Sequence, residues 1–270
     1  MTEAVLRHRI VILTGPAIWH RNSCATWIRA GLNIVGICYC DQRTFRLPLR
    51  AAWKSLRTGA PWRLFGQILG RAYYEVCNGR KDRAIAERIL NLRRIEEALK
   101  SWNGAVYHTS DYSRPETIAW LASLRPDVFL VHTPYWVGKK VRDLAAKGIT
   151  IGGHPGLTPW YRGSYSPFWA IYRGHAEDVG ASVFWLSGRV DAGDLVVQER
   201  IAIEDGDSHV TLGWKGMSRI AEIQARVLDD FDHGVPIPRR PHREIPPDSV
   251  YPVPTLLDYL RYRRRQKRVR

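Results

Sequence analysis

Short apolar runs that end in turn residues alternate with segments of helical periodicity along the first two thirds of the chain. Such runs predict buried strands, at 9–15, 33–40, 104–109, 127–133 and 149–153. Helices are expected between them, over 25–33, 83–102 and 138–147. A further helix is expected to begin at Ser113, which can serve as its N-cap because Glu116 follows three residues later. Continuous apolar strands between helices are typical of parallel sheets covered on both faces. The pattern predicts an α/β, Rossmann-like fold with a mostly parallel sheet.

The rest of the pattern predicts a small C-terminal extension. A helix over 166–174, strands over 180–186 and 194–203, and a helix over 209–231 precede a stretch in which seven prolines exclude regular elements. A short helix, TLLDYLRYRRR, closes the chain. We therefore expect one domain over 1–205, with a basic helical insertion at about 43–103. A helical and proline-rich extension with a basic tail follows over 206–270.

Charge adds the expectation of an anionic partner. The 270 residues carry 41 Lys and Arg against 26 Asp and Glu, a formal net charge of +15. Much of this excess lies in 43–94 and in the tail RYRRRQKRVR at 261–270. A nucleotide, a nucleic acid or an acidic membrane surface would each match it, and the tail could equally be a solvated, frayed end.

Compartment and metal content follow from what the sequence lacks. No apolar stretch approaches the roughly 20 residues that span a bilayer, and the N-terminal run is too short for a secretory signal. We therefore expect a soluble, cytoplasmic protein. The four cysteines have neither zinc-ribbon nor CxxC spacing, so buried, reduced thiols and no metal are expected.

Glycines and prolines, which have unusual backbone preferences, surround one histidine in the stretch IGGHPGLTPWYRG at 151–163. Its glycines permit close approach of a ligand to the backbone, and its prolines stiffen the turn that carries His154. Asp191 lies in a second glycine-bounded loop, and a carboxylate beside an imidazole stabilises the imidazolium. Such a pair can take a proton from an amine and return it to a leaving group. A structural histidine is the alternative.

These motifs together resemble those of the folate-dependent formyltransferases. The family pattern is Asn-x-His-Pro-x-x-Leu-Pro, then Arg-Gly, and further on an Asp-x-Gly loop; IGGHPGLTPWYRG, PFWAIYRG and GASVFWLSGRVDAGDLVVQE follow the same order. The resemblance implies N10-formyltetrahydrofolate as the formyl donor, His154 as catalytic acid and base, and Asp191 as its partner. Gly152 falls where the family has an asparagine that holds the formyl oxygen, a departure that puts charge stabilisation in question.

The resemblance also assigns binding segments, most of them through main-chain groups. The pterin ring would lie against Trp136, Val137 and Gly138 and against the loop of Ser187, Gly188, Arg189 and Val190. Gly152 and Arg162 are expected at the acceptor. Arg162 could alternatively fasten its own turn.

The acceptor is inferred by elimination within the family. The sequence TGPAIWHRNS lacks the Gly-Ser-Asn phosphate loop of the ribonucleotide branch, and too little chain follows residue 205 for the barrel of the tRNA branch. A nucleotide-linked amino sugar, as in lipopolysaccharide biosynthesis, remains. The basic, aromatic segment 43–76 could bind its diphosphate, or could instead cover the core or dock on a membrane.

Other functional classes stay open as alternatives for this protein. An RNA-binding protein or a tRNA-directed formyltransferase would account for the charge, although nucleic acid is not the favoured partner. A non-catalytic folate-binding relative, or one that transfers the formyl group to water, would account for Gly152. The C-terminal segment could form a homodimer interface.

Overall fold

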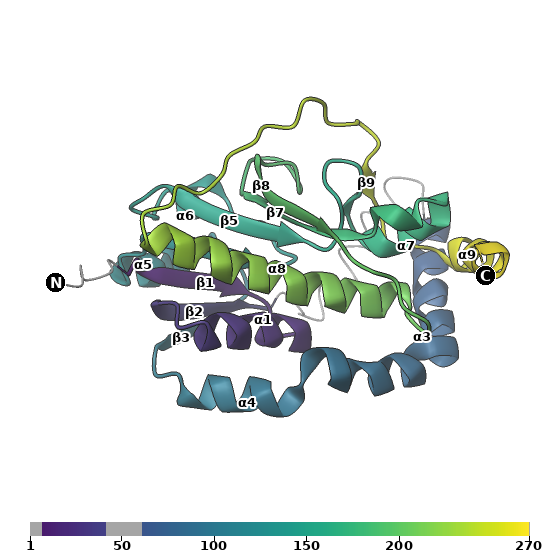
Figure 1. The fold of residues 1–270 in the computed structure, drawn as a ribbon, viewed down its shortest axis with the longest axis horizontal. Helices are drawn as coiled ribbons and strands as arrows, with labels where there is room; N and C mark the ends of the chain where they lie inside the picture. Colours follow the sequence, from purple (N-terminus) through teal and green to yellow (C-terminus); the bar gives the residue numbers. More distant parts are fainter. Residues whose placement is uncertain (1–6, 42–60, 270) are drawn as a thin grey trace.

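The computed structural model describes residues 7–41 and 61–269, and it contains one central sheet of seven strands (Figure 1). Their order across the sheet is β3-β2-β1-β4-β5-β7-β8. The strands are β1 (Ile10–Thr14), β2 (Ile34–Cys40), β3 (Ala105–Thr109), β4 (Val128–His132), β5 (Ile149–His154), β7 (Gly180–Trp185) and β8 (Leu195–Arg200). The first five pair in parallel, and β7 and β8 are antiparallel additions. The predicted mostly parallel sheet is confirmed.

Helices cover both faces of this sheet, as the apolar runs predicted. They are α1 (Ile18–Arg29), α3 (Pro61–Leu90), α4 (Leu92–Ser101), α5 (Pro115–Ser123), α6 (Lys139–Arg142), α7 (Ser166–Arg173), α8 (His209–Asp232) and α9 (Leu256–Val269). Every residue of β1 is buried because Ile10 and Ile12 face one core while Val11 and Leu13 face the other. In Figure 1, α1 and α8 run alongside each other on the first of these faces.

Two helices differ from the expected boundaries. Helix α1 begins at Ile18, ahead of the expected 25–33, and the chain leaves it through Gly31 in the left-handed region (φ +74°). The expected single helix over 83–102 is two helices, because Asn91 also adopts a left-handed conformation (φ 34°) and its side chain caps α4 by accepting from the Arg94 amide. The insertion is therefore mainly helical where it is described, and residues 43–60 lie outside the described part.

Three local expectations were wrong. Ser113 does not cap α5, because its hydroxyl donates to Asp111 Oδ1 and Arg114 occupies the N-cap position. The helix expected over 138–147 is reduced to α6, and the rest forms turns. Cys77 is exposed on α3, whereas Cys24, Cys38 and Cys40 are buried and free. Burial raises the pKa of the Cys24 and Cys38 thiols to about 12, which leaves them unreactive.

The C-terminal segment returns to the body of the domain. Helix α8 buries Ile220, Ala221 and Ile223 in the same core as β1, so this helix packs as part of the sheet domain; the division at residue 205 stays a prediction. Within the proline-rich stretch, β9 (Val250–Tyr251) pairs in parallel with β6 (Arg162–Gly163), an element that the prolines were expected to prevent. Helix α9 then packs against α3 and α7 through a tyrosine-rich cluster.

Ser208 links the start of α8 to α3, the long helix of the insertion. Its hydroxyl caps α8 by accepting from the Val210 and Thr211 amides, and it donates to the buried Asp82 of α3 at 2.8 Å. Ser208→Ala should lower the free energy of unfolding by roughly 2 kcal/mol, measured by denaturant titration, because a cap and a bond to a carboxylate are lost together. Ser101→Ala, which removes only a local bond to Ala98, is the matched control; equal effects of the two changes would contradict the assignment.

Candidate active site

His154 is the last residue of β5 and lies buried at the carboxyl end of the sheet. Its Nδ1 is 3.3 Å from Asp191 Oδ2, so the two residues that the sequence suggested as a pair are brought together. On the other side of the ring, Nε2 lies 2.6 Å from Ser166 Oγ and 2.9 Å from the Tyr161 carbonyl oxygen. Both ring nitrogens therefore have polar partners.

Asp191 is held by the backbone of its neighbours. The Gly163 amide donates to Asp191 Oδ2 at 2.9 Å, and Gly163 itself has φ +83°, a conformation that favours glycine. Asp191 itself also lies in the left-handed region (φ 46°). The Asp191 side chain remains 23% exposed against 8% for His154, so the ion pair opens on the aspartate side.

The surroundings of His154 accommodate a protonated ring. A carboxylate faces Nδ1, and a carbonyl oxygen, which can only accept, faces Nε2. Ser166 can donate to the neutral Nε2 or accept from the protonated one, and it also reaches the Tyr161 carbonyl at 3.2 Å. The Tyr161 carbonyl and Ser166 can both accept from Nε2–H, and the Ser166 hydroxyl can donate to Nε2 when that nitrogen carries no proton.

Ser166 is a site residue that the sequence reasoning missed. It begins α7, directly after Tyr165 in a left-handed conformation (φ 57°), and it is almost fully buried. A serine ahead of Pro167 reads as an ordinary helix start, and nothing in its spacing from His154 indicates contact. Only the fold of the intervening turn brings its hydroxyl to the imidazole.

Gly152 lies on β5 two residues before His154, so the two positions share one face of the strand. Phe184 and Leu186 occupy the space above it: a Cβ at Gly152 would lie 2.9 Å from Leu186 Cδ1 and 3.1 Å from Phe184 Cε2. The position where the resembling family has an amide is therefore filled by apolar side chains from the end of β7. Gly152 fits this packing as a glycine.

Arg162 is a buried internal anchor. Its guanidinium donates to Ser249 Oγ, to the Val190 carbonyl and to the Pro246 carbonyl, at 2.9, 3.1 and 3.2 Å. Burial lowers the pKa of Arg162, and the nearby Asp191 carboxylate opposes that shift. The Asp191 carboxylate thus favours the charged form of the Arg162 guanidinium, while the hydrogen bonds of that guanidinium go to Ser249, Val190 and Pro246. A role for Arg162 in acceptor binding stays a prediction.

The two segments expected to hold a pterin ring lie beside each other. Val137 is buried in the cluster against which Leu186 packs, and Arg142 Nη1 donates to the Leu186 carbonyl at 3.0 Å. Trp136 and Val190 remain 57% and 46% exposed, so each segment has an apolar side chain at the surface. Ser187 Oγ accepts from the Arg189 amide and forms the turn that contains Gly188. The binding of a pterin ring by these two segments stays a prediction.

The described residues also show no metal cluster and no membrane-spanning helix. Among them, no group of three or more His, Cys, Asp or Glu side chains could hold a metal ion. None of the described helices combines the length and apolarity needed to cross a membrane.

A sequence model described as formyl transferase matches residues 76–228, which is more than half of the chain. The chain belongs to the formyl transferase family. The match includes β5, the His154 turn, the Asp191 loop and most of α8. Membership confirms the resemblance that the motifs suggested.

Similar proteins differ in the acceptor that their names give. A methionyl-tRNA formyltransferase of Chlorobium chlorochromatii is 31% identical over 134 residues, 50% of this chain and 41% of that protein. A GDP-perosamine N-formyltransferase of Brucella melitensis is 31% identical over 116 residues, 43% of this chain and 44% of that protein. The matched part thus spans less than half the length of either relative.

Solved structures agree with the fold. A glycinamide ribonucleotide transformylase from Symbiobacterium toebii superposes with a TM-score of 0.56 at 16% identity, covering 89% of this chain and 95% of that one. A sugar N-formyltransferase from a Shewanella species gives 0.53 at 11% identity, covering 96% and 88%. At these identities the likeness establishes the fold alone.

Arg162→Ala is expected to destabilise the formyltransferase by on the order of 3 kcal/mol, because three buried or partly buried oxygens lose a charged donor. Thermal and denaturant unfolding measure the effect. Arg240→Ala removes an exposed arginine from the same C-terminal segment and should leave stability within about 0.5 kcal/mol. Comparable losses in the two variants would argue against the anchor.

Gly152→Asn should lower the free energy of unfolding by about 2 kcal/mol, because the new side chain meets Leu186 and Phe184. Leu186→Ala provides room, so the double variant should be more stable than the sum of the two single effects by roughly 1 kcal/mol or more. A double-mutant cycle in urea measures this coupling. Strict additivity would mean that Leu186 does not fill the site of the missing side chain.

Proposed function

We propose that this formyltransferase transfers a formyl group from N10-formyltetrahydrofolate to the primary amine of a nucleotide-linked amino sugar. The observation that carries the proposal is the His154–Asp191 ion pair at 3.3 Å, at the carboxyl end of β5, beside two loops suited to a flat ring. Ligands of open α/β sheets bind at this edge. The family supplies the reaction type, and the arrangement of polar groups supports the assignment of roles.

When bound, the donor supplies a formyl carbon that is open to attack by an amine. The segments at 136–138 and 186–191 fit its ring through backbone groups and through the exposed side chains of Trp136 and Val190. Leu186 and Val137 form the packed floor between these segments. This chain's contribution is to hold the donor and to exclude water from the reacting carbon.

Proton transfer is the task assigned to His154. The acceptor nitrogen loses a proton as its new bond to the formyl carbon forms, and the departing folate nitrogen gains one as the old bond breaks. Ser166 can donate to Nε2 of His154 when this nitrogen carries no proton, and both Ser166 and the Tyr161 carbonyl can accept from it when it does. The Asp191 carboxylate faces Nδ1 and balances the positive charge that the ring gains with the proton, while the Gly163 amide holds that carboxylate.

The missing amide at Gly152 changes how oxygen charge is stabilised. Phe184 and Leu186 fill that position, so no polar side chain there can reach the formyl oxygen. We assign the task to the imidazole of His154 once it has taken the proton of the acceptor, with the Asp191 carboxylate beside it. One ring then both moves the proton and opposes the developing negative charge.

Support for an amino-sugar nucleotide comes from two sides. One relative of similar identity is named for transfer to GDP-perosamine, an amine on a nucleotide-linked sugar. The net charge of +15 suits an anionic acceptor. The methionyl-tRNA relative keeps a tRNA acceptor as the second candidate, because the same charge would suit RNA.

The decisive experiment supplies N10-formyltetrahydrofolate with a panel of aminosugar nucleotides and measures tetrahydrofolate release. We expect release that depends on the acceptor, and a loss of at least about 10³-fold in kcat for His154→Asn and for Asp191→Asn, with folate binding retained. The exposed His233→Gln is the matched control and should transfer at the normal rate.

Each alternative has its own result in the same assay. Release without acceptor, with formate as product, indicates hydrolysis. Folate binding without any turnover indicates a non-catalytic relative. Transfer only to charged initiator tRNA, weakened steeply by salt, indicates the tRNA-directed activity. Normal transfer by either site variant would overturn the roles of His154 and Asp191.

A further inference from the structure

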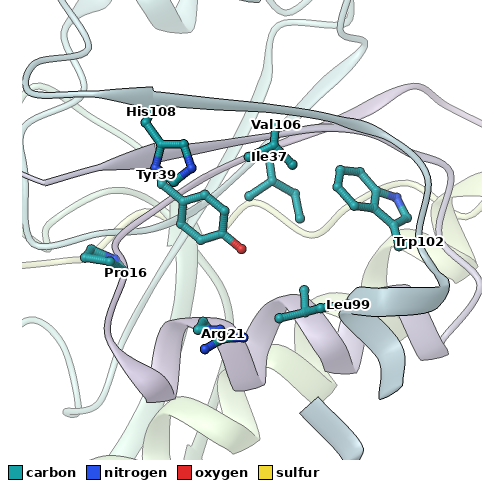
Figure 2. A pocket seen from close by; sticks show the side chains of 8 residues that line it. All are labelled: Pro16, Arg21, Ile37, Tyr39, Leu99, Trp102, Val106 and His108. Carbon is teal, nitrogen blue, oxygen red and sulfur yellow. The ribbon is translucent and has the colours of Figure 1, made fainter. Parts of the chain in front are cut away.

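A cavity of about 300 Å³ lies over β2 and β3, beside α1 and the end of α4 (Figure 2). Strands β2 and β3 form its floor, and Leu99 and Trp102 at the end of α4 form one wall. Pro16, which follows β1, and Arg21 on α1 form the remaining side. None of these residues belongs to the candidate active site.

Strand register builds the floor of this cavity. Ile37 of β2 pairs with Val106 of β3, and Tyr39 pairs with His108 one step nearer the carboxyl ends. The Tyr39 and His108 rings stack, with centroids 5.3 Å apart and planes 18° from parallel. Val106 is 51% exposed, so the cavity opens along the outer side of β3. Figure 2 shows the two stacked rings at one end and Trp102 at the other.

The lining favours a planar, apolar group attached to an anion. The rings of Tyr39, His108 and Trp102 offer stacking surfaces, and the Trp102 indole is fixed by donating to the Ile34 carbonyl at 3.0 Å. Arg21 is the cation at the cavity, and within the described part of the chain its guanidinium makes no ion pair or hydrogen bond. A guanidinium without a protein carboxylate is suited to a phosphate oxygen.

The position of the cavity relates it to the active site. Pro16, Tyr39 and His108 follow or end β1, β2 and β3, so the polar end of the cavity lies at the same edge of the sheet as His154. In the sheet order, β2 is separated from β5 by three strand spacings, roughly 14 Å. A ligand that reached both places would need several linked groups between its amine and its ring.

We propose that this cavity binds the nucleoside diphosphate part of the acceptor, with the base against Tyr39, His108 and Trp102 and the diphosphate at Arg21. The proposal rests on the proposed function, because it places the sugar amine at His154. The base provides a flat ring for the aromatic lining, the diphosphate matches the unpaired guanidinium, and the sugar extends along the carboxyl edge past β1 and β4.

Calorimetric binding of free UDP, GDP and dTDP tests the proposal without any formyl transfer. Val106→Trp fills the cavity from the open edge strand, and we expect it to weaken nucleotide binding by at least about tenfold. Arg21→Gln should weaken binding by roughly ten- to a hundredfold, as expected for loss of a charged hydrogen bond. Arg29→Gln, on the exposed last turn of the same helix, is the matched control and should bind like the unaltered protein.

Further measurements distinguish a failure of the cavity assignment from a failure of the proposed function. His154→Asn should bind the nucleoside diphosphate normally, since the cavity lies on other strands. Nucleotide binding that Val106→Trp and Arg21→Gln both leave unchanged, in proteins with normal thermal unfolding, would overturn the cavity assignment even where aminosugar transfer is observed. Binding that both variants weaken, without transfer to any aminosugar nucleotide, would support the cavity and count against the proposed function. Pyrophosphate that binds as tightly as the nucleotides would overturn the role of the aromatic lining.

Discussion

One carboxylate oxygen, Oδ2 of Asp191, is the point on which the arrangement of the active site depends. It lies 3.3 Å from Nδ1 of His154 and accepts the Gly163 amide at 2.9 Å. Three separate pieces of chain therefore meet at a single atom: the end of β5, the β6 segment and the loop after β7. Asp191 has a left-handed backbone conformation, and such a conformation persists only where its surroundings hold it.

Those surroundings come largely from the C-terminal segment. Arg162 binds the Val190 carbonyl, next to Asp191, and is itself held by Ser249 and the Pro246 carbonyl. The adjacent amides add to this: Arg162 donates to Ser249 and Ser164 donates to Tyr251, which forms the β6–β9 pair. The proline-rich stretch thus acts as a brace behind the aspartate loop. Its prolines limit the conformations of the unfolded chain and so reduce the entropy lost when the brace forms.

The sheet could be predicted because its signal is local. The strand Ile10–Thr14 is apolar throughout, since both of its faces are covered, and this property is visible in five consecutive letters. His154 and Asp191 were found through their glycine-bounded turns. Ser166 and Ser249 were not, because each acts through a contact with a residue distant along the chain. The break at Asn91 and the failed cap at Ser113 were missed for a related reason: several polar residues could have taken each role, and packing chose among them.

Gly152 shows why a motif and a site are different levels of description. Read as a motif, the glycine is a lost amide. In the structure, Leu186 and Phe184 occupy its place, and Leu186 also packs against Val137, on the other loop of the proposed donor site. A side chain at position 152 would therefore disturb both the strand and that loop.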